Sequence, residues 1–363
     1  MPVSRLVVKI GTTSLTTADG EFRAGIAQAL VQGIGAVRRI GVEVVVVVSG
    51  AIALGVRRLA VARPAETTRL QAMSAVGQIE LLGQLALLFH ANEMEVGQIL
   101  LAPQDFGDRR QYLHARATLQ ELLRLDVVPV INENDAVANE EIRFGDNDRL
   151  AALVAHLVHA DLLLLLTDLP GVYDADPHRV SGARLLERLE VDEFERVQAL
   201  GSISGRGSGG MSSKLAAASI AARSGVDCLI ASAETASVIE HAVQGRPHPS
   251  THIPALGVRE SARRLWIAYA TDPEGRLVVD DGARRALRSG TASLLAVGVR
   301  EVLGRFMAGA SVEIVAADGE ILARGLCRLD SSAILGSRAI AVHRDDLALL
   351  NAAEVDDHAE PLR

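Results

Sequence analysis

The chain has 363 residues, of which 49% are hydrophobic and 23% are charged, and its formal net charge is −8. This length suffices for two domains with sizeable cores, and the acidic balance excludes a general polyanion binder, although a local basic face is compatible with it. Cys228 and Cys327 match no metal or disulfide spacing, so we expect buried or inert thiols in a reducing compartment.

Short β-branched runs alternate with longer helical patterns over roughly the first 230 residues, which is typical of a parallel α/β sheet. Val44–Val48 is five consecutive valines, too β-branched for a helix and apolar on both faces, as expected of a central parallel strand. Five strands are predicted in all: Leu6–Ile10, Val44–Val48, Val127–Ile131, Leu162–Leu166 and Cys228–Ala231.

Small or polar residues follow nearly every predicted strand. In strand order they are Gly11-Thr12-Thr13-Ser14, Ser49-Gly50-Ala51, Asn132-Glu133-Asn134-Asp135, Thr167-Asp168 and Ser232. In open α/β sheets, ligands bind beyond the carboxyl ends of the strands. We therefore expect one composite binding site at that edge of the sheet.

Lys9 lies inside the first predicted strand, where a buried charge is costly unless an anion compensates it. It could be an edge-strand lysine or one that points outward, but the Gly-Thr-Thr that follows favours phosphate binding at a helix N-terminus. Ser49 could likewise be only a helix N-cap, or its hydroxyl could help to hold a carboxylate. The run Asn132–Asp135 could be an ordinary loop, although its polar density favours a ligand site.

A helical pattern, Arg149–His159, follows Gly145-Asp146-Asn147-Asp148. We assign Asp146 as a helix cap, whereas Asp148, in the first turn, could orient two lysines. His156 and His159 are expected to be structural. The sequence contains no evident metal-ligand cluster, so a metal is expected to enter with a nucleotide, as Mg²⁺ usually does.

The densest glycine run lies between Gly205 and Lys214, with four glycines in six residues. Such a run lets backbone N–H groups approach an anion closely, and the lysine beyond it indicates a phosphate. The run is not a P-loop, because Met211 stands where that motif requires lysine.

Prolines between Gly245 and Pro254 mark the end of a domain. Beyond them we predict short strands at Arg264–Ala270, Leu277–Asp280, Ser311–Ala316, Ile321–Leu326 and Ala339–His343, with a hairpin turn at Ala317–Glu320. The expected organisation is therefore a first domain over 1–256, a connection over 257–272 and a small, mostly β domain over 273–352. The acidic tail from Asn351 is expected to fray.

Neither a signal peptide nor a membrane span is expected. The N-terminus lacks a hydrophobic signal segment, and the longest apolar stretch, Leu150–Leu166, is interrupted by His156, His159 and Asp161. We expect a cytoplasmic protein that does not bind membranes.

Taken in order, these motifs resemble those of the glutamate 5-kinases, a branch of the amino acid kinase family. The motifs are Val7–Thr12, Ser49–Ala53, Val130–Asp135, Gly145–Asp148 and Ser208–Lys214. The C-terminal part is similar to a PUA domain at Gly290–Leu295, Val297–Val299, Gly304–Phe306 and Gly309. The resemblance implies an α/β fold, with an open, mainly parallel sheet sandwiched by helices, followed by a small PUA-like barrel.

The resemblance also implies a reaction, ATP-dependent phosphorylation of the glutamate side-chain carboxylate, with Mg²⁺ carried by the ATP phosphates. Lys9 and Lys214 are expected to neutralise the transferring phosphoryl group, and Asp148 to orient them. The implied glutamate-binding residues are Ser49, Gly50, Ala51, Asn132, Asp135 and Asn147. The implied ATP-binding residues are Lys9, Gly11, Thr12, Thr167, Asp168, Ser208, Gly209, Gly210, Met211, Ser212, Ser213 and Lys214. Expected partners are proline as feedback inhibitor, a dimer or tetramer of the chain, and glutamyl-phosphate reductase.

The chemistry of the acceptor agrees with this independently. A side-chain carboxylate has a pKa of about 4.3 and is already a nucleophile at neutral pH, so no general base is required. The enzyme must instead bring two anions together by positioning and positive charge.

Two alternatives remain open. One is another amino acid kinase, acting on acetylglutamate, aspartate or a small phosphate. The other is an RNA-binding or RNA-modifying protein that uses the PUA domain. From Arg259 onward there are 14 arginines and no lysine against 16 acidic residues. This segment therefore lacks the excess of basic residues expected of an RNA-binding surface.

Overall fold

The computed structural model describes residues 2–106, 109–137, 146–177, 179–199, 210–257, 260–269, 273–290 and 292–350. The chain divides into two compact units, Met1–Asp105 with Arg110–Arg259 and Phe106–Arg109 with Glu260–Arg363. The helix α10 (Ala262–Tyr269) belongs to the second unit, although it lies in the segment 257–272 predicted as a connection. The domain limits 1–256 and 273–352 stay predictions.

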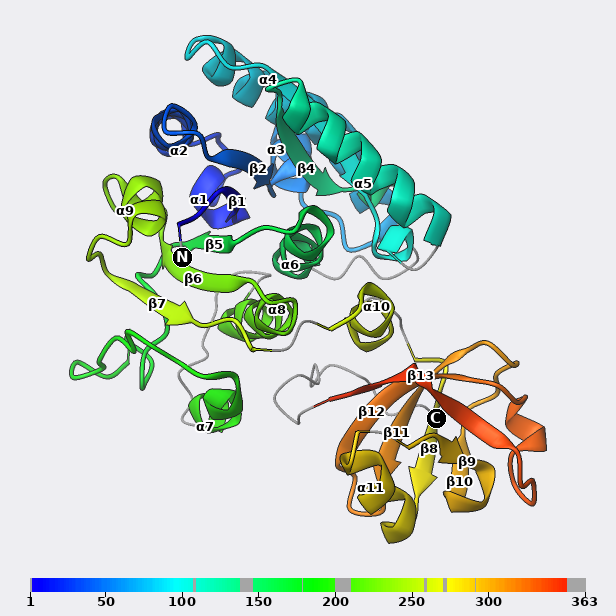
Figure 1. The fold of residues 1–363 in the computed structure, drawn as a ribbon. Coiled ribbons are helices and arrows are strands. Elements are labelled where there is room, and N and C mark those ends of the chain that lie inside the picture. Colours follow the sequence, from blue (N-terminus) through cyan, green and yellow to red (C-terminus); the bar gives the residue numbers. More distant parts are fainter. Residues whose placement is uncertain are drawn as a thin grey trace. The chain divides into compact units, whose positions relative to one another are not determined.

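The first unit is built on a seven-stranded sheet with the order β3-β4-β2-β1-β5-β6-β7 (Figure 1). Its strands are β1 (Arg5–Ile10), β2 (Glu43–Val47), β3 (Val96–Leu101), β4 (Val128–Glu133), β5 (Leu162–Thr167), β6 (Asp227–Ser232) and β7 (Ser250–Ile253). All neighbouring pairs are parallel except β6 and β7, which are antiparallel. The five predicted strands are confirmed as β1, β2, β4, β5 and β6.

The two edge strands escaped the sequence analysis. β3 is only partly buried and contains Gly97 and an exposed Gln98, so its apolar pattern is weak. β7 lies within Gly245–Pro254, which was predicted only as the end of a domain. That prediction was incomplete, because prolines flank a short strand where they remove no hydrogen bond from the middle of the sheet.

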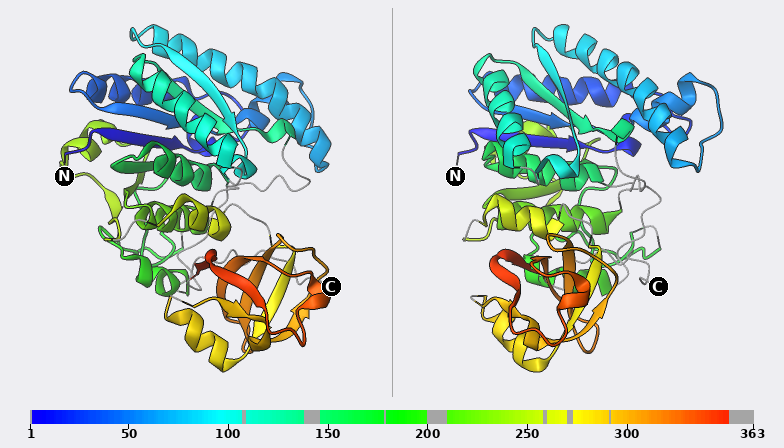
Figure 2. Two further views of the ribbon diagram at one scale, coloured as in Figure 1. Left: turned by 45° about the vertical axis from the view of Figure 1, so that its right-hand side comes forward. Right: turned by 90° about the vertical axis from the view of Figure 1, so that its right-hand side faces the viewer.

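Helices flank the sheet on both faces (Figure 2). They are α1 (Thr12–Leu15), α2 (Ala24–Arg38), α3 (Ala51–Arg58), α4 (Thr67–His90), α5 (Arg109–Arg124), α6 (Asp146–Val158), α7 (Phe194–Ala199), α8 (Met211–Arg223) and α9 (Val238–Gln244), with short 3₁₀ turns η1 (Pro103–Phe106), η2 (Asp135–Val137) and η3 (Val191–Glu193). One core cluster joins α2, α4 and α9 to alternate residues of the strands, such as Leu6, Val8 and Ile10. Because strand side chains alternate between faces, Val7 and Lys9 point to the other face, where α6 and α8 pack together.

The apolar stretch Leu150–Leu166 is divided between α6 and β5 rather than forming one span. Among the described residues one helix, α4, is long and apolar enough to cross a membrane, with 33% of its apolar window buried. The core helix of a globular protein can be equally long and apolar, and Leu81, Leu85 and Phe89 of α4 lie in the main core cluster. Its length and composition therefore do not establish a membrane span.

α3 and α4 cross at unusually short range because glycines stand at their contact. A Cβ atom on Gly55 would lie 1.9 Å from the carbonyl oxygen of Met73, and one on Gly77 would lie 1.7 Å from that of Ala51. Only glycine allows backbones to approach so closely. This crossing fixes α4 against the N-terminal end of α3.

The second unit contains a six-stranded sheet with the order β10-β8-β11-β12-β13-β9. Its elements are α10, β8 (Gly275–Val279), α11 (Asp281–Arg288), β9 (Leu294–Leu295), η4 (Ala296–Gly298), β10 (Val299–Leu303), β11 (Ser311–Ala316), β12 (Ile321–Cys327), η5 (Ser331–Ala333) and β13 (Ile340–Leu349). Four predicted strands are confirmed as β8, β11, β12 and β13. The predicted turn at 317–320 is also confirmed, since it joins antiparallel β11 and β12 and Gly319 has a φ of +89°.

The predicted strand Arg264–Ala270 was wrong, because residues up to Tyr269 form α10. Leu265 and Ala268 are both buried and lie three residues apart, a helical spacing. The helix packs on β12 and β13, and the Arg324 side chain donates a hydrogen bond to the Ala268 carbonyl. Tertiary packing has overridden the β propensity of the aromatic and branched residues.

Candidate active site

Lys9 and Lys214 lie against one buried carboxylate. The Nζ atom of Lys9, on β1, is 2.5 Å from Asp148 Oδ1, and the Nζ atom of Lys214, on α8, is 3.1 Å from Asp148 Oδ2. Asp148 is completely buried, and the two lysines are 4% and 5% exposed. The structure thus brings the three predicted catalytic residues together, one from each of β1, α6 and α8.

These two lysines are the only lysines in the whole sequence, and all other basic residues with permanent charge are arginines. An ammonium is a compact point charge with three donors, whereas a guanidinium is a planar fork. A site that must place two positive charges around one small anion suits ammonium groups. The composition therefore singles out this cluster within the chain, a signal that the sequence analysis missed.

Burial and charge act in opposite directions within the cluster. Burial lowers the pKa of Lys9, and the nearby Lys214 charge lowers it further, while Asp148 opposes both. Burial alone would raise the pKa of Asp148, but the charges and hydrogen bonds of Lys214 and Lys9 outweigh it and hold that pKa below its ordinary value. Two ammonium groups around one carboxylate form an arrangement that suits an incoming anion.

Asn147 joins the ends of two parallel strands. Its Nδ2 atom donates to Ser49 Oγ at 2.9 Å, just beyond β2, and to Asn132 Oδ1 at 3.0 Å, near the end of β4. Asn132 was predicted to follow its strand, whereas β4 in fact continues to Glu133. The N-cap of α3 is Gly50, with a φ of +111°, so Ser49 is not that helix's cap.

Gly11 and Thr12 also lie at this edge. A Cβ atom on Gly11 would be 3.7 Å from Lys9 Nζ, so this glycine lies directly beside the lysine's ammonium group. Gly50 stands near Thr12, since its Cβ atom would be 3.9 Å from Thr12 Cγ2. Ala51, the first residue of α3, is buried beside Gly77 of α4.

Asp135 begins the 3₁₀ turn η2 after β4 and is buried. Its Oδ2 atom accepts a hydrogen bond of 2.6 Å from Ser74 Oγ on α4. One turn farther along α4, Gln78 Nε2 donates to the Glu133 carbonyl at 3.3 Å. Sequence reasoning missed both α4 residues, because nothing in their spacing connects a serine and a glutamine on an apolar helix to a distant strand end.

Thr167 ends β5, and its hydroxyl donates to Asp168 Oδ1 at 2.9 Å. Gly210 is the N-cap of α8, so Met211, Ser212, Ser213 and Lys214 form the first turn of a helix rather than part of a loop. Ser213 Oγ lies 3.2 Å from Asp148 Oδ2, beside the lysine pair. The predicted ATP-binding residues Ser208 and Gly209 lie outside the described residues.

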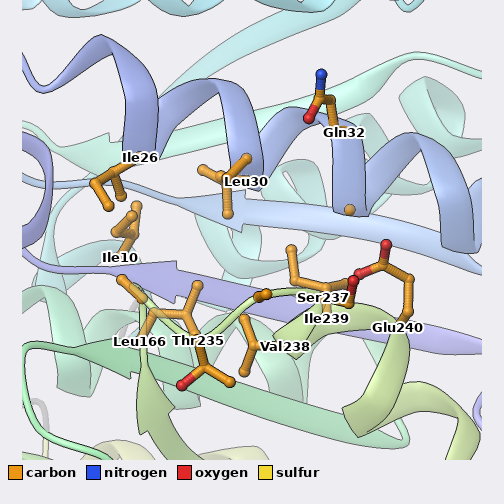
Figure 3. A pocket seen from close by; sticks show the side chains of 14 residues that line it. Ile10, Ile26, Leu30, Gln32, Leu166, Thr235, Ser237, Val238, Ile239 and Glu240 are labelled. Carbon is orange, nitrogen blue, oxygen red and sulfur yellow. The ribbon is translucent and has the colours of Figure 1, made fainter.

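A pocket of about 250 Å³ lies between α2 and α9 (Figure 3). Its lining residue Ile10 points to the opposite face of β1 from Lys9, because neighbouring residues of a strand alternate between the two faces. Ile26 and Leu30 of α2 and Val238 of α9 line the pocket, together with Ile10 and Leu166. The latter two residues directly precede Gly11 and Thr167 in the sequence. The pocket's lining contains none of the predicted site residues.

The described part of the chain offers no group of three or more His, Cys, Asp or Glu side chains that could hold a metal ion. Both oxygens of Asp148 face lysines and are therefore poor candidates for ligands. This donor set fits a divalent ion that arrives with nucleotide phosphates rather than one held by protein carboxylates alone.

The sequence was compared with protein families and curated proteins. The model of the amino acid kinase family matches residues 4–232, and the PUA domain model matches residues 275–344. The chain is 45% identical to a glutamate 5-kinase of Myxococcus xanthus over 364 residues, covering 95% of this chain and 96% of the relative. It is 43% identical to that of Frankia casuarinae over 365 residues, with coverage of 95% and 96%.

Among solved structures, the carbamate kinase from Giardia lamblia bound to AMP-PNP superposes with a TM-score of 0.51. The match covers 70% of this chain and 99% of that structure, at 15% sequence identity. This likeness concerns the fold alone.

Proposed function

Because the chain belongs to the amino acid kinase family, we propose that it transfers a phosphoryl group from ATP to the side-chain carboxylate of L-glutamate, the first step of proline biosynthesis. Relatives at 40–45% identity over nearly the whole chain include the glutamate 5-kinases described above, which supports this acceptor. The single observation that carries the proposal is the pair of buried lysines around Asp148, next to the polar cluster of Ser49, Asn132 and Asn147.

In this mechanism the lysines supply positive charge. Glutamate's carboxylate is ionised at neutral pH and attacks without a general base, so the main obstacle is the repulsion between two anions. Lys9 and Lys214 neutralise the transferring phosphoryl group, and Asp148 fixes their positions by forming an ion pair with each. Preorganised charges in a buried site stabilise the transition state more effectively than charges in water.

ATP is assigned to the glycine-rich segment and the neighbouring strand ends. The proposed ligands are Lys9, Gly11, Thr12, Thr167, Asp168 and Ser208–Lys214. The N-terminus of α8 offers backbone N–H groups, which suit a phosphate. Mg²⁺, when bound to the ATP phosphates, neutralises part of their charge.

Glutamate is assigned to Ser49, Gly50, Ala51, Asn132, Asp135 and Asn147. Asp135 is the only charged side chain in this set, and its charge is negative. The only positive charge on glutamate is the α-ammonium group, so Asp135 is its natural partner.

Several further features of the proposal rest on the resemblance to glutamate 5-kinases. They are a cytoplasmic location, feedback inhibition by proline, assembly into a dimer or tetramer, and a glutamyl-phosphate reductase that consumes the product. RNA binding by the second unit is disfavoured, because many of its arginines already face carboxylates. Arg284 pairs with Asp318 and Glu320, and Arg263 with Asp346.

A hydroxamate-trapping assay tests the acceptor. The chain is incubated with MgATP and, in separate reactions, glutamate, acetylglutamate or aspartate, with and without proline. We expect hydroxamate from glutamate and a lower rate with proline. Activity restricted to another acid would overturn the assignment, and salt-sensitive RNA binding would revive the alternative role of the second unit.

A further inference from the structure

The hydroxyl of Ser74 has a specific place beside the proposed glutamate site. Ser74 is 1% exposed, and its Oγ atom lies 2.6 Å from Asp135 Oδ2 in a buried hydrogen bond. Within the described residues, the Ser74 hydroxyl is the hydrogen-bond donor found for this carboxylate, and it bonds Oδ2 rather than Oδ1. The serine thus fixes one oxygen of the carboxylate and leaves the other for a ligand.

The helix that carries Ser74 is held rigidly. Gly55 packs against the carbonyl of Met73, the residue before Ser74, and Gly77 packs against the carbonyl of Ala51. Gln78 adds a hydrogen bond to the Glu133 carbonyl. Because these contacts bracket Ser74 on both sides, its hydroxyl has little freedom to move relative to Asp135.

We propose that Ser74 is a positioning residue that orients Asp135 toward the substrate's α-ammonium group and so contributes to the choice of a free amino acid over an N-acylated one. The inference rests on the proposed function, since it takes Asp135 as the partner of that ammonium group. An N-acetyl group removes the positive charge of the substrate and leaves a buried carboxylate without a counter-charge.

The test compares Ser74→Ala with a matched control, Ser224→Ala. Ser224 is also fully buried, and its hydroxyl bonds the Ile220 carbonyl at the end of α8. In Ser74→Ala we expect the KM for glutamate to rise about tenfold or more, as for a lost hydrogen bond to a charged group. The KM for ATP and kcat are expected to change less than about threefold, and Ser224→Ala should leave all three constants unchanged.

A double-mutant cycle asks whether Ser74 acts through Asp135. Glutamate affinity is measured by calorimetry, in the presence of a non-hydrolysable ATP analogue, for Ser74→Ala, Asp135→Asn and the double variant. We expect the effects to be strongly non-additive. We also expect Ser74→Ala to lower the ratio of glutamate to N-acetylglutamate affinity, which a merely structural role would not change.

The outcomes distinguish a failure of the role proposed for Ser74 from a failure of the proposed function. If the unaltered chain phosphorylates glutamate but Ser74→Ala keeps a normal KM for it, or the cycle is additive, the role of Ser74 is overturned and the function stands. If the unaltered chain does not phosphorylate glutamate, both the function and this inference are overturned.

Discussion

Lys9 and Lys214 lie against the two different oxygens of a single carboxylate, that of Asp148, although 205 positions separate them in the sequence. One lysine comes from the central strand of the sheet and the other from the first turn of α8. The arrangement places two ammonium groups around one carboxylate, which suits the role in phosphoryl transfer that we propose for them.

Removing one lysine should abolish most turnover but not the fold. In Lys214→Ala, Asp148 still faces Lys9, so the buried charges remain balanced. We expect kcat to fall by about two orders of magnitude or more, the range for a lost electrostatic group in the transition state. Steady-state kinetics and thermal unfolding measure both effects. Near-normal turnover in a folded variant would reject the assigned role of Lys214.

Removing the carboxylate of Asp148 should destabilise the fold more than removing one lysine does. Asp148→Asn removes the carboxylate that both buried ammonium groups face, and breaking a buried ion pair in this way costs about 3–5 kcal/mol. We therefore expect a large loss in the free energy of unfolding in denaturant, well beyond that of Lys214→Ala. Equal stability of the two variants would contradict the electrostatic account of the cluster.

The scarcity of lysine makes amine chemistry specific for the site. Apart from the N-terminal amine, an amine-reactive reagent can modify only Lys9 and Lys214. Because burial lowers the pKa of Lys9, its reactive neutral form prevails at lower pH than for an ordinary lysine. We expect MgATP to protect both residues and modification to inactivate the enzyme, as followed by peptide mass spectrometry. Full modification without loss of activity would contradict the proposed roles.

The fall of kcat/KM for glutamate at acidic pH, the acid limb of its pH profile, should report on the protonation of Asp135. Burial raises the pKa of Asp135 above its ordinary value of 3.8, and the hydrogen bond from Ser74 offsets part of this rise. Only the ionised carboxylate pairs with an ammonium group, so kcat/KM for glutamate falls as Asp135 takes up a proton. Ser74→Ala removes the offset, which raises the pKa further and moves the limb to higher pH.

The measurement is kcat/KM for glutamate in the unaltered chain and in Ser74→Ala, from about pH 4.5 to pH 8. The substrate carboxylate, with a pKa of about 4.3, titrates identically with both proteins and cannot produce a difference between them. The buried carboxylate of Glu133 is likewise present in both. Superimposable acid limbs would show that Ser74 does not influence the ionisation of Asp135.

The crossing of α3 and α4 allows a matched pair of stability measurements. Gly77→Ala places a methyl group 1.7 Å from the Ala51 carbonyl, where only backbone could yield, so we expect destabilisation of about 1–3 kcal/mol or more. Gly83→Ala, on an exposed position of the same helix, meets nothing within 4 Å and should stabilise by up to about 1 kcal/mol. Denaturant unfolding compares them, and similar values for both would contradict the close packing.

The sequence predicts the inner strands well, because β-branched runs such as Val44–Val48 have a strong local preference and no competing periodicity. Prediction from the sequence fails where long-range packing determines the secondary structure. The predicted strand Arg264–Ala270 has strand-like composition, but residues 264–269 form most of α10, and β7 is held by its pairing with β6. The candidate site shows the same division. Lys9 and Asp148 stand out as charges in apolar or helical contexts, whereas Ser74 has no local mark.

The sequence by itself determined the sheet's inner strands, the polar residues at their ends and the family. It also contains only two lysines, both of which belong to the proposed site. The resemblance implied that Asp148 orients both lysines. Only the tertiary structure decided that the lysines face its two different oxygens, that Asn147 joins Ser49 to Asn132, and that Ser74 faces Asp135. The physical reason is that periodicity and propensity are local properties, whereas these contacts depend on the register of parallel strands and on the crossing of α3 and α4. Those relationships join residues 15 to 205 positions apart and leave no local pattern in the sequence.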